Sequence, residues 1–451
     1  MRTILKVTAL ALIFALPAGH AQSTASAQPP ARAAETLPAR LQAFMDAQAS
    51  LYGFSGAVLV RKGDQVLLRK AYGLADREWG VPNGLDTRFR IASASKAFTA
   101  VAIMKLVEIG RLSLDDRLER FLPGFPKGDS ITIRMMLNHS SGLARNHDMD
   151  IATDIEMTRE KALPIVRAKP LAFEPGSQVG YSNTAFLLLS WIIEDVSGKS
   201  FSEFMEENVF RPAGLRDTGI YDPTNLTLRR ARHYWFENPG AGGPAKGEMW
   251  PNYSMFQGHG NLYSTVDDLA RFLDAFKGSG LLTRGSVTAM MTAQGDSPWG
   301  LGLELPSQVG HRAFGHGGSF NGARVDAWAF QDDDVTAVII SNNAFETNGM
   351  VRALAALTFG QEVDMPSRRT RTQVAPAILA RYAGTYGRGD IIFRDGKLMI
   401  GETEMIPESQ TKFFELGNPN HTYEFVLAPD GKVTAVLFGR YGLRRSVPRR
   451  D

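Results

Sequence analysis

Residues 89–110 read FRIASASKAFTAVAIMKLVEIG, and this stretch decides what kind of fold the chain can form. From Phe98 onward, apolar side chains point in almost every direction around a helix, and Gly110 ends the pattern. A helix that is apolar all round lies buried between layers of a protein and not on its surface. We therefore predict a buried helix over residues 93–109.

Ser93 and Lys96 form an S-x-x-K motif at the start of this helix. A spacing of three places Lys96 one turn along, on the same face as Ser93. The helix N-terminus offers free N–H groups to a developing oxyanion, and a desolvated lysine favours its neutral form, which can accept the serine proton. The same letters also arise by chance, with a lysine that only extends toward solvent. The motif alone therefore identifies a candidate nucleophile and base.

The flanking patterns alternate between strand and helix. Helices are predicted at residues 37–48 and 350–359, strands at 56–60, 66–71, 299–305, 324–330 and 335–341, and mostly helical structure over 115–290. Strands thus lie at both ends of the domain, and helices fill the middle. We predict an α/β fold in residues 37–360, with an antiparallel sheet flanked by helices and an inserted all-helical region.

The remainder of the chain has a different pattern. Residues 361–376 are polar, contain two prolines and predict a linker. In residues 377–451 short strand-like runs recur about every 8–12 residues, which is typical of a small all-β barrel. We expect a frayed, charged tail at the C-terminus, where the arginines are Arg444, Arg445, Arg449 and Arg450.

Composition excludes several classes of protein. The chain has 451 residues, a formal net charge of +3 and no cysteine, so disulfides, Cys-based zinc sites and thiol catalysis are excluded. Its charges are spread along the chain, so we expect no nucleic acid partner. His139 and His147 lack the spacing of a metalloenzyme motif, so we expect no metal and no other cofactor. The expected partner is a small-molecule or peptide substrate.

The N-terminus has the pattern of a secretory signal peptide. Arg2 and Lys6 precede an apolar run, and small residues then offer cleavage sites after Ala21 or Ala27. The run is too short for a membrane span, which needs about 20 apolar residues. We predict a signal peptide in residues 1–27, a flexible leader in 28–36, no integral membrane segment after cleavage, and a secreted or periplasmic protein.

Two further motifs follow S-x-x-K. They are Tyr181-Ser182-Asn183, before an apolar helix, and Gly315-His316-Gly317-Gly318, which we expect just before a strand. Each is weak alone. In this order the three motifs resemble the serine β-lactamase and penicillin-binding-protein superfamily, in its class C branch, over residues 38–360. The matching segments around them are residues 89–92, 137–143, 173–176 and Ser264-Thr265 with Asp268. Residues 382–386 open a part that resembles the lipocalin-like β-domain of some of these hydrolases.

The resemblance implies a catalytic role for several residues. Ser93 is the acylated nucleophile and Lys96 is its general base. Tyr181 relays the proton to the leaving group and helps to activate the deacylating water. The oxyanion hole consists of the backbone N–H groups of Ser93 and Ser319.

The resemblance also implies a set of substrate-binding residues. Asn183 holds a substrate carbonyl, and His316 takes the place of the basic residue of the third motif, beside Gly317 and Gly318. The family's β-lactamases and DD-peptidases usually have K-T-G there, with a lysine that meets the substrate carboxylate. Histidine is only partly charged at neutral pH. The chain therefore resembles the D-aminopeptidase and esterase side of the branch.

The expected function is an exported serine hydrolase that forms an acyl-enzyme on amide or ester bonds of D-amino-acid peptides, D-amino-acid amides or small esters, with slow hydrolysis of β-lactams. The alternatives are a true class C β-lactamase, a D-Ala-D-Ala carboxypeptidase, or a non-catalytic protein that binds penicillin or peptidoglycan fragments. An α/β-hydrolase is excluded because no G-x-S-x-G motif occurs.

Overall fold

The computed structural model describes residues 35–147, 157–222, 225–236, 245–247, 253–278, 280–295 and 297–450. The predicted signal peptide and most of the predicted leader lie outside the described residues. Leu37–Asp451 form one compact unit. Within the described ranges, no helix has both the length and the apolar character needed to cross a membrane.

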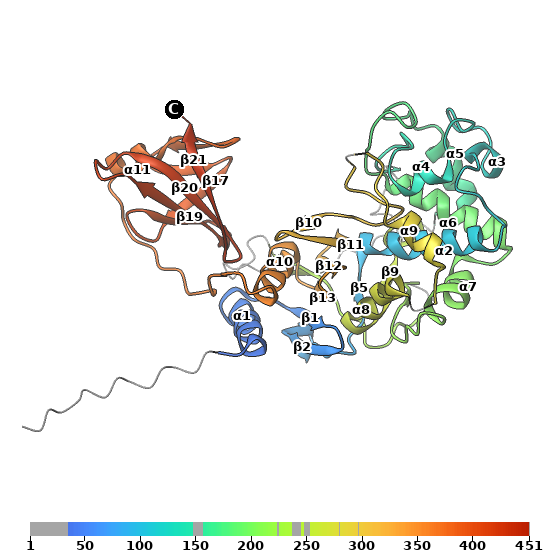
Figure 1. Cartoon of the computed structure of the whole chain (residues 1–451), viewed down its shortest axis with the longest axis horizontal. Helices are drawn as coiled ribbons and strands as arrows, with labels where there is room; N and C mark the ends of the chain where they lie inside the picture. Colours follow the sequence, from blue (N-terminus) through green and yellow to red (C-terminus); the bar gives the residue numbers. More distant parts are fainter. Residues whose placement is uncertain are drawn as a thin grey trace, which may run out of the picture. The chain divides into compact units, whose positions relative to one another are not determined.

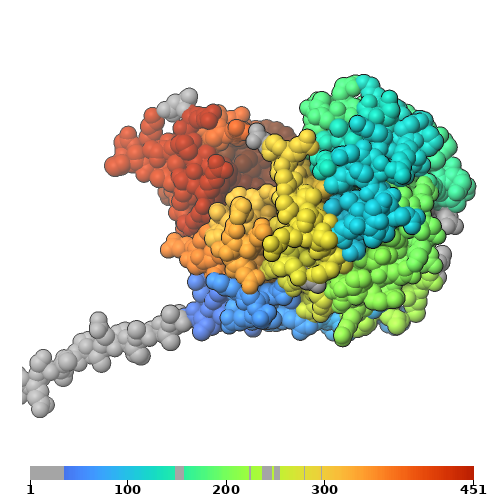
Figure 2. Space-filling model, turned by 45° about the vertical axis from the view of Figure 1, so that its right-hand side comes forward, coloured from blue at the N-terminus to red at the C-terminus, as the bar shows by residue number. Residues whose placement is uncertain are grey.

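The centre of the unit is a six-stranded antiparallel sheet (Figure 1). In spatial order its strands are β10 (Ser307–Gln308), β11 (His311–Phe320), β12 (Ala323–Phe330), β13 (Val335–Ser341), β1 (Gly56–Lys62) and β2 (Gln65–Tyr72). The strands predicted at 56–60, 66–71, 324–330 and 335–341 are confirmed, and they pair as the hairpins β1–β2 and β12–β13. Because β1 pairs with β13, Gly56 lies opposite Ser341. Figure 2 shows the resulting contact between the blue start and the orange end of this domain.

Both faces of the sheet are covered. Side chains of β1 alternate between them: Val58 and Val60 pack with α1 (Leu37–Tyr52) and α10 (Thr347–Thr358), whereas Ala57 and Leu59 pack on the side of α2 (Ser95–Glu108) and α8 (Val266–Asp274). This two-sided burial explains why β1 is apolar without alternation. The predicted buried helix is confirmed as α2, and Ser93 lies one turn before it, in the 3₁₀ turn η1 (Ala92–Ala94).

The inserted region between β2 and β10 is mainly helical, as predicted. Helix α6 (Asn183–Ser197) packs against α2 and begins at the N-cap Ser182, whose hydroxyl accepts a hydrogen bond from the Ala185 N–H. The other helices of this region are α3 (Leu118–Phe121), α4 (Ile133–Leu137), α5 (Arg159–Arg167), α7 (Phe201–Met205) and α9 (Arg284–Met290), with the tighter or wider turns η2 (Glu206–Phe210), η3 (Tyr253–Phe256) and η4 (Ala275–Lys277). Short strands are β3 (Leu74–Asp76), β4 (Val81–Pro82), β5 (Phe89–Arg90), β6 (Gly219–Ile220), β7 (Tyr234–Phe236), β8 (Ala245–Gly247) and β9 (Leu262–Ser264).

Two predictions about strands in this domain are wrong. Residues 299–305 form a tight return with isolated bridges in place of a strand, because Gly302 takes a left-handed φ of 69° and Gly300 donates to the Leu303 carbonyl. This return places Glu304 against Gly315. The prediction that residues 315–318 lie just before a strand is also wrong, because these residues lie inside β11.

The C-terminal part is a closed eight-stranded antiparallel barrel, so the predicted barrel is confirmed. After residues 361–375, which form neither helix nor strand, come α11 (Pro376–Tyr382), β14 (Gly384–Tyr386), β15 (Gly389–Arg394), β16 (Lys397–Ile400), β17 (Thr403–Pro407), β18 (Lys412–Glu415), β19 (Asn418–Leu427), β20 (Val433–Arg440) and β21 (Leu443–Arg450). The prediction of a frayed C-terminal tail is wrong, because the arginine-rich end forms strand β21. It pairs with β20 and β14, and this closure removes both open sheet edges.

Buried side chains join the barrel to the first domain. The side-chain amides of Gln48 and Asn420 exchange two hydrogen bonds of 2.8 and 3.0 Å. Tyr441, which is 2% exposed, packs within the apolar cluster around α1 and α10. Glu346, at the N-cap of α10, contacts His421 and Arg440 of the barrel. The barrel therefore supports the N-terminal end of α10.

Candidate active site

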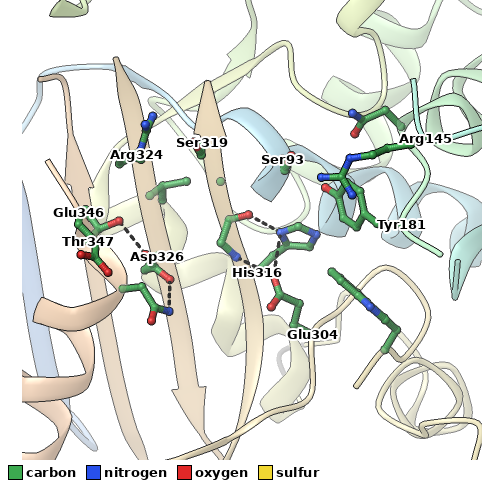
Figure 3. A pocket seen from close by; sticks show the side chains of 16 residues that line it. Ser93, Arg145, Tyr181, Glu304, His316, Ser319, Arg324, Asp326, Glu346 and Thr347 are labelled. Atoms are coloured by element: carbon green, nitrogen blue, oxygen red, sulfur yellow. Dashed lines mark hydrogen bonds and ion pairs between the residues drawn. The ribbon is translucent and has the colours of Figure 1, made fainter. Parts of the chain in front are cut away.

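One cavity of about 640 Å³ brings the three motifs together (Figure 3). It collects side chains from η1, from the turn before α6, from the return before β10 and from β11. Its lining comprises Ser93, Arg145, Tyr181, Asn183, Trp299, Glu304, His316, Gly317, Gly318, Ser319, Arg324, Val325, Asp326, Glu346, Thr347 and Asn348. Of the predicted site residues, Lys96 is absent from this lining because it lies beneath Ser93, with 0% of its surface exposed.

Ser93 and Lys96 are in direct contact. The Nζ atom of Lys96 lies 3.2 Å from Oγ of Ser93 and donates to the His259 carbonyl oxygen at 3.1 Å. Burial lowers the pKa of Lys96 well below its ordinary value, the positive charge of Arg145 lowers it further, and Glu304 opposes them. Burial therefore favours the neutral amine beside the hydroxyl, which is the form that a general base requires.

The turn that carries Ser93 is locally strained. Ala92 has a left-handed φ of 44°, which an alanine rarely adopts. The surrounding structure holds it, because the residues on both sides of Ala92 are hydrogen-bonded: Ile91 donates to Leu262, and Ala94 donates back to Ile91. Backbone strain of this kind is often found at functional sites.

Tyr181 lies against the Ser93–Lys96 pair. Its ring centroid is 4.7 Å from Nζ of Lys96. Burial raises the pKa of Tyr181 well above its ordinary value, although a hydrogen bond with the Ser93 side chain opposes this. The phenol therefore keeps its proton at neutral pH. From this position a neutral hydroxyl can both accept a proton and donate one.

His139 supports Tyr181 from below. Its ring stacks 4.5 Å from the Tyr181 ring, and its Nδ1 accepts the Ser182 N–H at 3.2 Å. Burial holds its pKa well below the ordinary value. Asn183 begins α6, and its Nδ2 donates to Oδ1 of Asn146 at 2.8 Å. His139 thus belongs to the packing of the site, and no cluster of metal-binding side chains occurs in the described ranges.

The edge of β11 passes directly alongside the nucleophile. A Cβ atom at Gly318 would lie 2.4 Å from the Ile91 carbonyl oxygen and 3.1 Å from the Ser93 nitrogen, so only glycine permits this approach. Ser319 follows on the same strand and lines the same cavity. The oxyanion hole between the N–H groups of Ser93 and Ser319 stays a prediction.

His316 differs from the sequence-based expectation in its charge. Its side chain is 3% exposed, and Nδ1 lies 2.5 Å from the Gly317 carbonyl oxygen. Burial, with a smaller effect of Lys96, lowers the pKa of His316 to about 3. The expected partial charge at neutral pH is therefore wrong, and the third motif presents a neutral imidazole in place of the family's usual cation.

Sequence reasoning missed the charged residues Arg145, Glu304, Arg324, Asp326 and Glu346 of the lining, and two of these bear on the motif residues. Glu304 lies beside His316, and its Oε1 accepts the Gly317 N–H at 3.2 Å. The Arg145 guanidinium lies 5.1 Å from the centroid of the Tyr181 ring. The only sequence signal for Glu304 is an acidic residue within the apolar run WGLGLEL, and Arg145 has none, because only the fold brings both near Ser93.

The family follows from a comparison of sequences. A sequence model of the Beta-lactamase family matches residues 39–359, which is most of the chain. The chain therefore belongs to the Beta-lactamase family, a superfamily of serine hydrolases. This agrees with the order of the three motifs and with the sheet and helices that carry them.

Individual relatives fall into two groups. The chain is 28% identical to penicillin-binding protein 4* of Bacillus subtilis, over 88% of this chain and 96% of that protein. It is 29% identical to a D-aminopeptidase of Brucella anthropi, over 64% of this chain and 56% of that protein. A solved D-amino acid amidase from Ochrobactrum anthropi SV3, complexed with L-phenylalanine, is 26% identical, with a TM-score of 0.62, over 71% of this chain and 98% of that structure.

Proposed function

We propose that this protein is an exported serine hydrolase that cleaves amide or ester bonds through an acyl-enzyme on Ser93, with D-amino-acid amides and short peptides as its main substrates. The observation that carries the proposal is the 3.2 Å contact between Oγ of Ser93 and Nζ of the fully buried Lys96, whose pKa burial lowers. Relatives that are named D-aminopeptidase and D-amino acid amidase support the substrate class.

The proposed acylation step uses three groups. Lys96 accepts the Ser93 proton while Oγ forms a bond to the substrate carbonyl carbon, and the backbone N–H groups of Ser93 and Ser319 stabilise the oxyanion. The carbon–nitrogen bond then breaks, and the proton passes from Lys96 to the leaving amine through Tyr181. In the second half, a water that Tyr181 helps to activate attacks the acyl carbon, and the bond between this carbon and Oγ of Ser93 breaks. One proton of the water passes to Oγ, and the carboxylic acid product leaves.

The third motif favours this activity over the class C β-lactamase and carboxypeptidase alternatives. Those enzymes bind a substrate carboxylate with a lysine, and His316 occupies the corresponding position here. Burial lowers the pKa of His316 to about 3, and the Glu304 carboxyl group lies 3.6 Å from its Nδ1. A neutral imidazole next to a carboxyl group is a poor partner for an anion. We therefore place β-lactam hydrolysis among side activities.

The test begins with a fluorophosphonate probe on the mature protein, followed by intact mass and peptide mapping. A single adduct on Ser93, absent from Ser93→Ala, supports the activated serine. A panel of D- and L-amino-acid amides, esters and β-lactams then ranks substrates. The absence of any adduct in folded protein would refute the proposal and favour the non-catalytic binding protein. The mass of the exported protein also identifies the signal cleavage site.

A further inference from the structure

Glu304 presents an unpaired carboxyl group to the active-site cavity. Its Oε1 accepts the Gly317 N–H, and within the described part of the chain no lysine or arginine pairs with either oxygen. Its side chain is 31% exposed, and the exposed part faces the cavity that Ser93 lines. Figure 3 shows it directly below His316. A carboxylate with little water and no cation is costly unless a ligand supplies the charge.

His316 adds a hydrogen-bond acceptor to the lining of the same cavity. Its Nδ1 faces the Gly317 carbonyl oxygen, so the proton of the neutral ring belongs on Nδ1 and leaves Nε2 as an acceptor. Nε2 is buried and has no partner among the described residues. The ring lies between Glu304 and Tyr181 in Figure 3. A buried acceptor that lines a cavity and has no protein donor calls for a donor on the ligand.

The other carboxylates of the cavity are already satisfied. Asp326 accepts hydrogen bonds from Thr347 at 2.6 Å and from the Trp328 indole at 3.0 Å, and Glu346 pairs with His421 and Arg440. Within the ranges that the structure describes, Glu304 is therefore the carboxylate of this lining that has neither a cation nor a side-chain hydrogen-bond donor.

The cations of the cavity lie elsewhere in the site. In the view of Figure 3, Arg145 and Arg324 are drawn on the opposite side of His316 from Glu304. Arg324 donates to its neighbour's carbonyl at 2.8 Å, and Arg145 packs over Tyr181. The cavity therefore has one side suited to a positively charged group of a ligand, at Glu304. Another side, at the two arginines, is suited to carbonyl or carboxylate oxygens.

We propose that Glu304, together with Nε2 of His316, forms a subsite for a primary ammonium group on the carbon next to the scissile carbonyl. An ammonium has three donors and no acceptor, which matches one carboxylate and one imidazole nitrogen. The subsite lies in the same cavity as the proposed nucleophile, because Glu304, Ser93 and Tyr181 all line it. The inference rests on the proposed function and narrows its substrates to those with a free amino group.

The raised pKa of Glu304 is also consistent with a subsite for an ammonium group. Burial and the nearby Asp326 raise the pKa of Glu304, to about 7, whereas the Gly317 N–H and Lys96 oppose this. A bound ammonium group stabilises the ionised form of Glu304, so the substrate supplies the positive charge that this carboxylate lacks. An N-acylated substrate brings no cation and leaves the carboxyl group unpaired, so it binds less well.

The experiment compares D-alanine p-nitroanilide with N-acetyl-D-alanine p-nitroanilide on wild type and Glu304→Gln. Glutamine keeps an acceptor for the Gly317 N–H and removes only the charge. We expect wild type to prefer the free amine at least about tenfold in kcat/KM. We expect Glu304→Gln to lose most of that preference, mainly through KM, so that the ratio of the two kcat/KM values falls toward one whatever change both substrates share. Glu362→Gln, an exposed carboxylate outside the cavity, is the control for general charge.

A competition experiment separates this inference from the proposed function. An α-aminoboronic acid and its N-acetyl form compete with fluorophosphonate for Ser93, which requires no turnover. Stronger protection by the amino form, lost in Glu304→Gln, supports the subsite even if neither anilide is hydrolysed. Equal protection by both boronic acids, or a preference unchanged in Glu304→Gln, would overturn it. Absence of Ser93 labelling refutes the proposed function instead.

Discussion

The amine of Lys96 lies 3.2 Å from the hydroxyl of Ser93 on a side chain with no exposed surface. Burial lowers the pKa of Lys96 well below that of most lysines, so the fold favours the neutral amine. The burial that makes Lys96 a base also lowers the stability of the fold. At neutral pH the Lys96 amine would be protonated in the unfolded chain, and folding disfavours that proton. This contact therefore links the chemistry of the site to the stability of the fold.

Lys96→Met should abolish labelling of Ser93 and stabilise the protein. We expect the labelling rate to fall at least about 100-fold, and the free energy of unfolding at neutral pH to rise by about 1–3 kcal/mol. Since the pKa of Lys96 is lowered in the fold, wild type loses stability relative to the variant as pH falls below the ordinary lysine pKa of about 10.4. Lys105→Met, on the same helix, is the control. Unchanged labelling in Lys96→Met would contradict the mechanism.

Arg145→Gln should shift the acidic limb of the pH profile of Ser93 labelling to higher pH. The positive charge of Arg145 is the second cause of the lowered pKa of Lys96, after burial. Its removal raises that pKa, so labelling of Ser93 should begin at higher pH and fall several-fold on the acidic side. Glu304→Gln should move the limb to lower pH, because it removes the opposing negative charge. The measurement is the labelling rate against pH, and shifts in the same direction for both variants would refute this account.

His421→Gln should flatten the pH dependence of stability between about pH 6.5 and 9. His421 lies 2.8 Å from Glu415 and 3.2 Å from Glu346, and these carboxylates raise the pKa of His421 to about 9 against the effect of burial. The protonated ring stabilises wild type fully below about pH 6.5, and the contribution is lost as pH rises through 9.

We expect this contribution to be about 1–2 kcal/mol after screening by solvent. Urea unfolding at several pH values measures it. His311→Gln, which removes a half-buried histidine beside Asp333 at the surface, is the control. Parallel stability curves for wild type and His421→Gln would show that the histidine contributes nothing.

Gly349→Ala should destabilise the protein even though the position is helical. Alanine in a helix is normally more stable than glycine by about 0.5–1 kcal/mol. Here a Cβ atom would lie 2.0 Å from Cδ2 of Tyr441, whose ring is buried between α10 and the barrel. We expect a net loss of about 1–3 kcal/mol in unfolding free energy. On a Tyr441→Ala background the same change should stabilise, and a loss of equal size there would exclude the clash.

Local pattern was sufficient for much of the fold. The apolar run after Ser93 predicted α2, short strand-like runs predicted strands β1, β2, β12 and β13 of the sheet, and the spacing of further short runs predicted the barrel. Such signals work because the burial of one helix face or strand face is repeated along neighbouring residues. The return at residues 299–305 and strand β21 were missed, since the first depends on glycine geometry and the second on edges supplied by β14 and β20.

The sequence by itself determined which residues could do chemistry: a serine and a lysine one turn apart, followed by a tyrosine and a histidine in a recognisable order. The tertiary structure decided their charge. It buried Lys96 and His316, which lowers the pKa of both, and placed Glu304 and Arg145 in the same site from distant segments. A pKa depends on desolvation and on neighbouring charges in space, and neither is written in the order of residues along the chain.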